Sequence, residues 1–374
     1  MRIGHVKGIA IKLHFSTLLI VALVGFYAAI FYLETVPGAL LWELILVGIL
    51  NGIIIVFSIL IHELAHSLMA LRHGLKVSEI ELYLFGGVSK MEEEPKTPKS
   101  EFVISIVGPL SSFILGIICL GLIFIPIQLP MWLIVTFFYS GITNIGLGIF
   151  NLIPAFPMDG GRVLRAILWN RRKNVLSATK TASKVGRFFG YSLMVLGFIQ
   201  MIFVGIFAGF WLVLMGSFLS SAAKKSYQQT VADFALSSIS VKEILIGARK
   251  FVIPSELPLI EGLKDYFMIF SQIYFPVVQE GGDFVGIIHL EDIKKIPIEH
   301  RDRYVIGDVM KSISDFPVTS EEDSGKEVMK KLIKMEKKPY IAVAQERETQ
   351  NIIGFIGETD IIRTIKLWEL NFRI

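Results

Sequence analysis

Cysteine is almost absent from this sequence of 374 residues, and charged residues are scarce. The single cysteine, Cys119, lies in a long apolar run, which excludes an intramolecular disulfide framework and a zinc finger built on cysteines. Charged residues make up 19% of the chain, against about 25% in typical soluble domains. Hydrophobic residues make up 53%. These proportions exclude an intrinsically disordered chain, a fibrous repeat and an ordinary soluble globule.

The few charges are distributed unevenly. Residues 1–222 contain 16 Lys and Arg and 10 Asp and Glu, whereas residues 223–374 contain 21 and 23. The pattern predicts a membrane domain at 1–222, a linker at 223–236 and a soluble domain at 237–374. It does not indicate nucleic-acid binding, because the basic residues lie beside apolar segments and form no patch with interleaved aromatic side chains.

Apolar runs of about 20 residues predict membrane-spanning helices. There are six such runs, at residues 15–33, 44–70, 102–127, 131–153, 188–206 and 207–222. A basic segment precedes the first run, as in a signal peptide, but no small-residue cleavage site follows it, so we interpret it as an uncleaved span. The loops on one side hold all 16 basic residues of the front half, and the loops on the other side hold none. Both termini and the soluble tail are therefore expected to be cytoplasmic.

The second predicted span contains the motif HELAH, residues 62–66. Side chains four residues apart lie on one face of a helix, so His62 and His66 can reach one metal ion. Neutral imidazole suits zinc, which lowers the pKa of bound water to about 7, and the carboxylate of Glu63 can take a proton from that water. A helix end with polar residues directed toward the cytoplasm is the alternative. It is disfavoured, because an unpaired carboxylate in a span costs about 2.5 kcal/mol or more.

A zinc site needs a third protein ligand. The fourth predicted span runs into NLIPAFPMDGGR, residues 151–162, where Asp159 is the only acidic residue between Glu101 and Asp233. Two prolines before it break the helix, and two glycines after it permit close backbone approach. We therefore expect Asp159 to be the third ligand. Asn151 could donate its amide N–H to a developing oxyanion, or it could simply cap the helix end.

These two motifs together resemble the site-2 protease family of intramembrane zinc metalloproteases. The motifs cover about residues 45–165, and the arrangement of six spans extends the resemblance to about residue 222. No inserted PDZ-like domain separates the motifs, so the sequence is similar to the smaller branch of the family, with a cytoplasmic regulatory tail. The resemblance implies membrane-protein substrates, one zinc ion per chain, and the following residue roles. His62, His66 and Asp159 would be the zinc ligands, Glu63 the general acid and base, and Asn151 a neighbour of the reacting carbonyl.

The segment LKVSEIELYLFGGVSK, residues 75–90, differs from the spans around it. Its alternating apolar residues and the Gly-Gly pair at 86–87 predict two short strands and a tight turn. The resemblance places this segment in the membrane-associated strand region of the family. A strand beside the membrane could offer its edge to an extended peptide, or the segment could be a structural hairpin only.

The soluble tail is an internal repeat. Residues 274–293 align with residues 338–361, and Gly286 and Asp292 match Gly354 and Asp360 at a common offset of 68. Each unit is predicted to be a helix–strand–strand–helix element that needs its twin to complete a core. The pattern resembles a tandem pair of cystathionine-β-synthase (CBS) domains, with boundaries at about 237–298 and 302–368.

The CBS resemblance implies that adenine nucleotides bind in the clefts of the pair, with Asp292 and Asp360 contacting ribose. The ligand-binding form of the repeat usually has Ser or Thr three residues after the glycine, but this chain has His289 and Gly357 there. The missing hydroxyls leave a structural role, or a homodimer formed through the CBS domains, as the alternative. We interpret His289 as a surface or cleft residue whose hydrogen bonds are satisfied, and not as a metal ligand.

The sequence therefore predicts a multi-pass α-helical membrane protein of about six spans with a C-terminal α/β CBS-domain pair. The predicted function is hydrolysis of peptide bonds in or near transmembrane segments by a zinc metalloprotease in the cell membrane, regulated by its tail. A non-enzymatic transporter or channel gated by the CBS pair is the alternative. An inactive scaffold of protease descent is disfavoured, because every expected chemical group is present.

Overall fold

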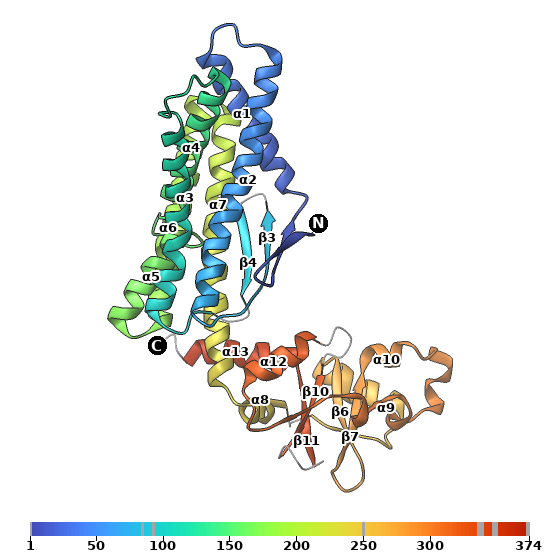
Figure 1. Ribbon diagram of the computed structural model, residues 1–374. Helices are drawn as coiled ribbons and strands as arrows, with labels where there is room; N and C mark the ends of the chain where they lie inside the picture. The colour runs from blue at the N-terminus through green and yellow to red at the C-terminus, as the bar shows by residue number, and fades with distance from the viewer. Residues whose placement is uncertain are drawn as a thin grey trace. The chain divides into compact units, whose positions relative to one another are not determined.

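The structure is a computed structural model that describes residues 2–83, 86–91, 94–248, 251–334, 340–345 and 351–371. The chain divides into two compact units, residues 1–228 and residues 229–374. The first unit is a bundle of long helices with a small sheet beside it, and the second contains two further sheets with short helices (Figure 1).

Five helices in the described part of the chain are long and apolar enough to cross a membrane. They are α1 (Thr17–Thr35), α2 (Leu41–Arg72), α3 (Pro98–Leu122), α4 (Met131–Asn151) and α6 (Val175–Phe203). Large apolar side chains cover the outside of the bundle; Phe57, for example, is 59% exposed. Such an exterior suits contact with lipid and not with water. The prediction of a multi-pass helical membrane protein is confirmed.

Two more helices begin in the described part of this unit, the short α5 (Asp159–Arg172) and the long α7 (Ile206–Ser238), whose last turns belong to the second unit. The sixth predicted span, residues 207–222, lies within α7, and the predicted linker, residues 223–236, forms the later turns of the same helix. The helix α6 begins at Val175, well before the predicted start of its span at residue 188. The side chain of Asn174 caps it by accepting from the Ser177 amide, so the polar first turns are helical although they are not apolar.

Paired glycines let the helices of the bundle approach one another closely. A Cβ atom on Gly25 of α1 would lie 2.6 Å from the carbonyl oxygen of Gly48 on α2. A Cβ atom on Gly116 of α3 would lie 2.9 Å from the carbonyl oxygen of Gly141 on α4. Small residues at crossings are typical of membrane helices, where packing and not the hydrophobic effect drives association.

Four strands form a sheet beside α2, in the order β1-β2-β3-β4. They are β1 (Arg2–Val6), β2 (Ile9–Leu13), β3 (Val77–Tyr83) and β4 (Gly86–Met91). The predicted strand pair is confirmed as the antiparallel pair β3–β4. Gly86 and Gly87 belong to β4, and residues 84–85, which connect the two strands, lie outside the described residues. The N-terminal strands β1 and β2 are not predicted from the sequence; they form an antiparallel pair, and β2 pairs parallel with β3.

An apolar core and a charged surface fix this sheet in place. Ile80 and Leu82 are buried against α2, in one cluster with Ile55 and Ile59. On the other face, Glu79 pairs with Lys12 of β2 and Lys90 of β4, which ties three adjacent strands together. Hydrogen bonds from these two lysines lower the pKa of Glu79 to about 2, so the carboxylate stays ionised at neutral pH.

The second unit confirms the predicted internal repeat. One sheet has the order β5-β6-β7-β8 and the other β11-β10-β9, and in each a central strand pairs parallel with one neighbour and antiparallel with the other. The strands are β5 (Ile253–Pro254), β6 (Tyr274–Val278), β7 (Phe284–His289), β8 (Lys311–Ser312), β9 (Val318–Ser320), β10 (Tyr340–Ala344) and β11 (Ile352–Gly357). The helices are α8 (Val241–Ala248), α9 (Leu259–Gly262), α10 (Leu290–Lys294), α11 (Ile306–Val309), α12 (Gly325–Lys334) and α13 (Glu358–Asn371).

The two repeats pack against each other through aromatic residues. Tyr274 of β6 lies beside Tyr340 of β10, with ring centroids 4.2 Å apart, and Phe284 of β7 contacts Phe355 of β11. These residues share one buried cluster. Residues 338–339 and 346–350 of the aligned stretch lie outside the described residues.

Candidate metal centre

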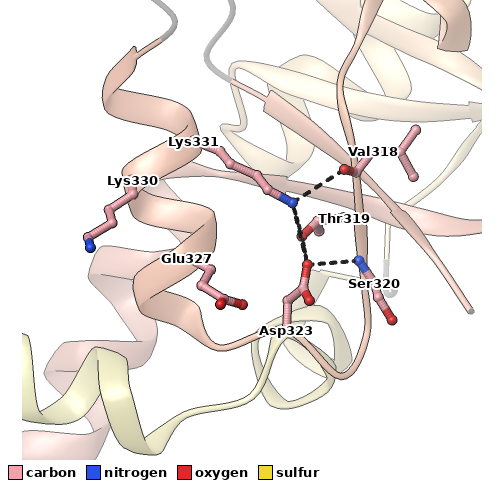
Figure 2. Close-up of a pocket in the computed structure, with 7 residues that line it drawn as sticks. All are labelled: Val318, Thr319, Ser320, Asp323, Glu327, Lys330 and Lys331. Carbon is pink, nitrogen blue, oxygen red and sulfur yellow. Dashed lines mark hydrogen bonds and ion pairs between the residues drawn. The ribbon is translucent and has the colours of Figure 1, made fainter. Parts of the chain in front are cut away.

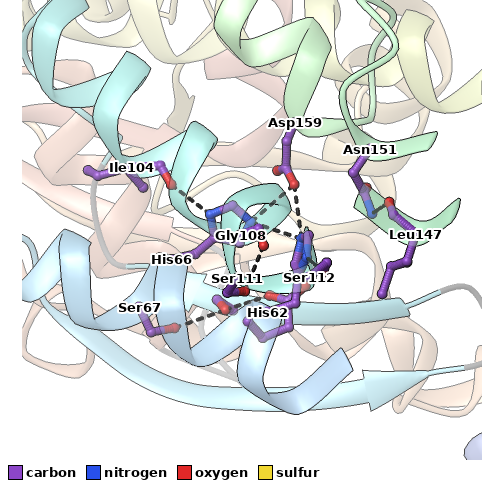
Figure 3. Close-up of polar contacts among 12 residues, drawn as sticks. His62, His66, Ser67, Ile104, Gly108, Ser111, Ser112, Leu147, Asn151 and Asp159 are labelled. Atoms are coloured by element: carbon purple, nitrogen blue, oxygen red, sulfur yellow. Dashed lines mark hydrogen bonds and ion pairs between the residues drawn. The ribbon is translucent and has the colours of Figure 1, made fainter. Parts of the chain in front are cut away.

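The three predicted metal ligands meet at one point inside the helical bundle (Figure 3). His62 and His66 are one turn apart on α2, and Asp159 is the first residue of α5. The Oδ2 atom of Asp159 lies 3.0 Å from Nε2 of His62 and 3.1 Å from Nε2 of His66. The two Nε2 atoms are 3.2 Å apart. The structure therefore brings together the ligand set that the sequence predicts.

The hydrogen bonds of the two imidazole rings orient them toward a cation. Nδ1 of His66 donates to the carbonyl oxygen of Ile104 at 2.6 Å, which can only accept. The Nε2 atom of the neutral ring then carries a lone pair. Nδ1 of His62 is 2.9 Å from the hydroxyl of Ser112. Such partners on the second ring nitrogen are typical of metal-binding histidines, because they fix the tautomer and the ring plane.

A glycine provides the space for the ion. A Cβ atom on Gly108 of α3 would lie 2.1 Å from Nε2 of His66 and 2.7 Å from Nε2 of His62. Zinc bonds of about 2.0–2.1 Å in a tetrahedron separate neighbouring ligand atoms by about 3.3 Å. The observed separations of 3.0–3.2 Å are close to that value. The residues present therefore fit a zinc ion. The contact of Gly108 with both histidines could not be predicted from the sequence.

Asp159 is held in place by an irregular segment, residues 152–158, between α4 and α5. The predicted close approach of the following glycines is confirmed. A Cβ atom on Gly160 would lie 2.3 Å from the carbonyl oxygen of Leu152, and one on Gly161 would lie 2.5 Å from the amide nitrogen of Phe156. No side chain fits at either position, so both glycines allow the chain to fold tightly under the third ligand.

A buried ion pair joins α5 to α3. Nε of Arg165 donates to Oε1 of Glu101 at 2.5 Å, and the two residues are 4% and 1% exposed. The guanidinium also lies 5.4 Å from the ring centroid of Phe156, in the segment before Asp159. Removing one partner of such a pair is strongly destabilising, because it leaves a buried charge uncompensated. The pair therefore fixes the position of the helix that begins with Asp159. Arg165 and Glu101 are 64 residues apart, so the sequence alone does not reveal that they pair.

The structure places the two predicted catalytic residues on different elements. Glu63 lies on α2 between the histidines and accepts a hydrogen bond at 2.9 Å from the hydroxyl of Ser89 on β4. Asn151 is the last residue of α4, and its amide nitrogen donates to the carbonyl oxygen of Leu147 at 3.0 Å. An amide nitrogen carries two N–H groups, so this bond uses one of them.

The two predicted ribose-contacting acids have different environments. Oδ2 of Asp360 accepts from the Gly357 amide at 2.9 Å and from the hydroxyl of Tyr274 on the other repeat. Asp292 instead pairs with two largely exposed lysines, Lys295 at 2.7 Å and Lys311 at 3.2 Å. Burial raises the pKa of Asp292, but these lysines more than compensate and hold it below its usual value.

His289 is the N-cap of α10, where its Nδ1 accepts from the Glu291 amide at 3.0 Å. This bond satisfies one nitrogen of the ring within the fold.

An open hollow of about 530 Å³ lies in the second repeat (Figure 2). Its lining residues come from β9, α12 and the turn between them: Val318, Thr319, Ser320, Asp323, Glu327, Lys330 and Lys331. Nζ of Lys331 lies 3.4 Å from Oδ2 of Asp323, which also accepts from the hydroxyl of Thr319 at 2.6 Å. Three of its polar side chains therefore pair with one another, and none of the predicted site residues lies in it.

Comparison with known proteins decides the family. The profile of peptidase family M50 matches residues 52–130 and 127–197, which contain all five predicted protease residues. The zinc metalloprotease MJ0392 of Methanocaldococcus jannaschii is 30% identical over 372 residues, which cover 99% of this chain and 97% of that protein. The chain belongs to peptidase family M50. This M50 protease is thus a zinc metalloprotease of the site-2 type, and the transporter alternative is excluded.

Two solved structures are similar to parts of this M50 protease. The site-2 protease from M. jannaschii has 33% identity and a TM-score of 0.42, and the match covers 61% of this chain and 94% of that one. The CBS domain of a bacterial CNNM/CorC family Mg2+ transporter has 20% identity and a TM-score of 0.32, and the match covers 42% of this chain and 94% of that one.

Replacement of Gly108 by Ala tests the metal centre of the M50 protease without changing any ligand. The new methyl group would occupy the space between the histidines, so the Gly108→Ala protein is expected to lose its zinc. Zinc per chain, measured by elemental analysis after mild dialysis, should fall well below the wild-type value. Gly121→Ala on the same helix is the matched control, because its Cβ atom meets nothing within 4 Å. Equal zinc in the two variants would contradict the proposed ion position.

Proposed function

We propose that His62, His66 and Asp159 hold the zinc ion and that Glu63 moves the proton during cleavage of peptide bonds in or near transmembrane segments. The observation that carries the proposal is the convergence of three electron-pair donors within 3.2 Å of one another, inside helices with an apolar exterior. Three acceptors in contact repel one another unless a proton or a metal cation lies between them, and the two histidine rings aim their Nε2 atoms at one point with the carboxylate. Two of the three donors lie on α2, a membrane-capable helix, so the cation would be bound within the membrane, where transmembrane substrates also lie.

Each residue has a defined task in the hydrolysis. Zinc, when bound, lowers the pKa of water and polarises a carbonyl group. Glu63 takes the proton of the water that adds to the scissile carbon, and it delivers that proton to the nitrogen of the departing amine when the C–N bond breaks. Asn151 donates its second amide N–H to the carbonyl oxygen as negative charge develops there.

The substrate reaches this site as an extended strand. A transmembrane helix has its carbonyl groups in internal hydrogen bonds, so the segment to be cut must first unwind. β4 is the last strand of its sheet, and among the described residues no strand pairs with its outer edge. An unwound segment can satisfy its backbone groups by pairing with that edge, and Ser89 of the same strand contacts Glu63.

Replacement of Glu63 by Gln tests the proposed proton transfer. A general acid or base contributes about 100- to 10,000-fold, so cleavage of a model transmembrane substrate by the purified variant should fall at least 100-fold. Zinc per chain should stay at the wild-type value, because the three ligands are unchanged. Glu34→Gln at the end of α1 is the control and should keep full activity. Near-normal cleavage by Glu63→Gln would remove Glu63 from the mechanism.

We also propose an orientation for the membrane domain, residues 1–222, in the cell membrane. The loops that hold its 16 basic residues face the cytoplasm, and both termini and the tail are on that side. Asp159 lies between the end of α4, which this orientation places at the cytoplasm, and the basic last turn of α5, so water enters the site from the cytoplasm.

Cysteine labelling tests this orientation in a chain whose single cysteine, Cys119, has been replaced by Ser. A membrane-impermeant maleimide added to intact cells should label Gln128→Cys, which lies in the turn between α3 and α4. It should not label Lys173→Cys, between α5 and α6, until the cells are broken open. The opposite pattern would invert the proposed topology.

For the tail, residues 237–374, we propose weak binding of an adenine nucleotide at Asp292. Lys295 and Lys311 are largely exposed, and such ion pairs are worth at most about 1 kcal/mol, so a ribose can displace them. The freed lysines can then pair with phosphate groups. Asp360 is less available, because a ribose would have to displace the hydroxyl of Tyr274 from it. A homodimer through this unit stays a prediction of the family resemblance.

Titration calorimetry on the full-length protein in detergent tests the nucleotide site. ATP at millimolar concentration should give saturable heat that Asp292→Asn abolishes. Asp283→Asn, in the turn between β6 and β7, should leave the heat unchanged. Absence of heat with ATP, ADP and AMP would assign the tail a structural role only.

A further inference from the structure

The strand β4 passes directly against the side chain of Glu63. Gly87 and Ser89 are two residues apart on this strand, so they share one face. A Cβ atom on Gly87 would lie 2.2 Å from Cγ and 2.7 Å from Cδ of Glu63. The glycine therefore leaves room for the carboxylate, and the serine on the same face can reach it.

Two serine hydroxyls form an ordered chain that ends at this carboxylate. Oγ of Ser89 lies 2.9 Å from Oε2 of Glu63, and Oγ of Ser67 lies 3.1 Å from Oγ of Ser89. A hydroxyl has one proton to donate, and an ionised carboxylate can only accept. Ser89 must therefore donate to Glu63, and it receives the proton of Ser67. Ser67 is 0% exposed and one helical turn after Glu63 on α2, so its own position is fixed by packing.

We propose that Ser89 is a positioning residue that holds the carboxylate of Glu63 in its working orientation. The hydrogen bond fixes one carboxylate oxygen, and this sets the plane of the group and the direction of the other oxygen. Charge-assisted bonds of this kind are stronger than those between neutral groups. Ser89 lies on the strand whose free edge is available to substrate, so one strand serves both the base and the scissile segment. The inference rests on the proposed role of Glu63.

Replacement of Ser89 by Ala tests this role. Loss of one hydrogen bond to a charged group corresponds to about a tenfold or larger effect, so kcat should fall at least about tenfold. KM should stay within about twofold of wild type, and zinc per chain and the thermal midpoint should not change. Ser89→Thr keeps the hydroxyl and suits a strand, so it should restore most of kcat. Ser67→Ala should cause a smaller decrease, because Ser89 can still donate.

Ser78→Ala is the matched control in the same sheet. The hydroxyl of Ser78 is exposed and donates to the carbonyl oxygen of Lys90 at 3.2 Å, away from Glu63. This variant should keep wild-type kcat and KM.

The outcomes separate this inference from the proposed function. An inactive Glu63→Gln with a fully active Ser89→Ala would overturn the role of Ser89 and leave the base in place. An active Glu63→Gln would remove the base itself. A higher KM with unchanged kcat would make Ser89 a substrate contact, and lost zinc would make it a support of the metal; either result overturns the positioning role.

Discussion

Two imidazole nitrogens and one carboxylate oxygen lie within 3.2 Å of one another between helices whose outer surface is apolar. Such a group of acceptors is unfavourable in a poorly solvating interior unless a cation neutralises it. The helix α3 suits such a cation, because Gly108 places no side chain against the two Nε2 atoms, and Ile104 and Ser112 hydrogen-bond the two rings. Three residues of α3 thus position His62 and His66, although α3 itself contributes no metal ligand to the candidate site.

The position of the proposed carboxylate ligand depends on a second buried electrostatic interaction. Asp159 begins α5, and the same helix carries Arg165, which pairs with Glu101 at the start of α3. Burying such a pair gains little stability by itself, because the desolvation of both ions offsets their attraction. Its directional hydrogen bond, however, sets where α5 lies against α3. Position, more than stability, is what the pair contributes to the metal centre.

The residues of the candidate metal centre could be predicted because their signals are local. His62 and His66 follow the helical period, and Asp159 stands alone in an apolar stretch with proline and glycine around it. Gly108, Ser112 and Ser89 could not be predicted, since their roles arise only when separate elements pack together. The strands of residues 2–13 were missed for the same reason, because their partner β3 follows two helices later. In the tail, spacing identified Asp360 but could not show that Tyr274 of the other repeat contacts it.

The residues that meet at the metal centre and in the buried ion pair are far apart in sequence, so they are synthesised at different times. Asp159 follows His66 by 93 residues, and Arg165 follows Glu101 by 64. While the chain is being made, α2 and α3 enter the membrane with an incomplete donor set and an unpaired acid. Arg165, the ion-pair partner of Glu101, becomes available only when α5 has been made. The donor set is therefore completed late in synthesis, and a nascent chain that ends before residue 159 has no complete site that could cut its neighbours.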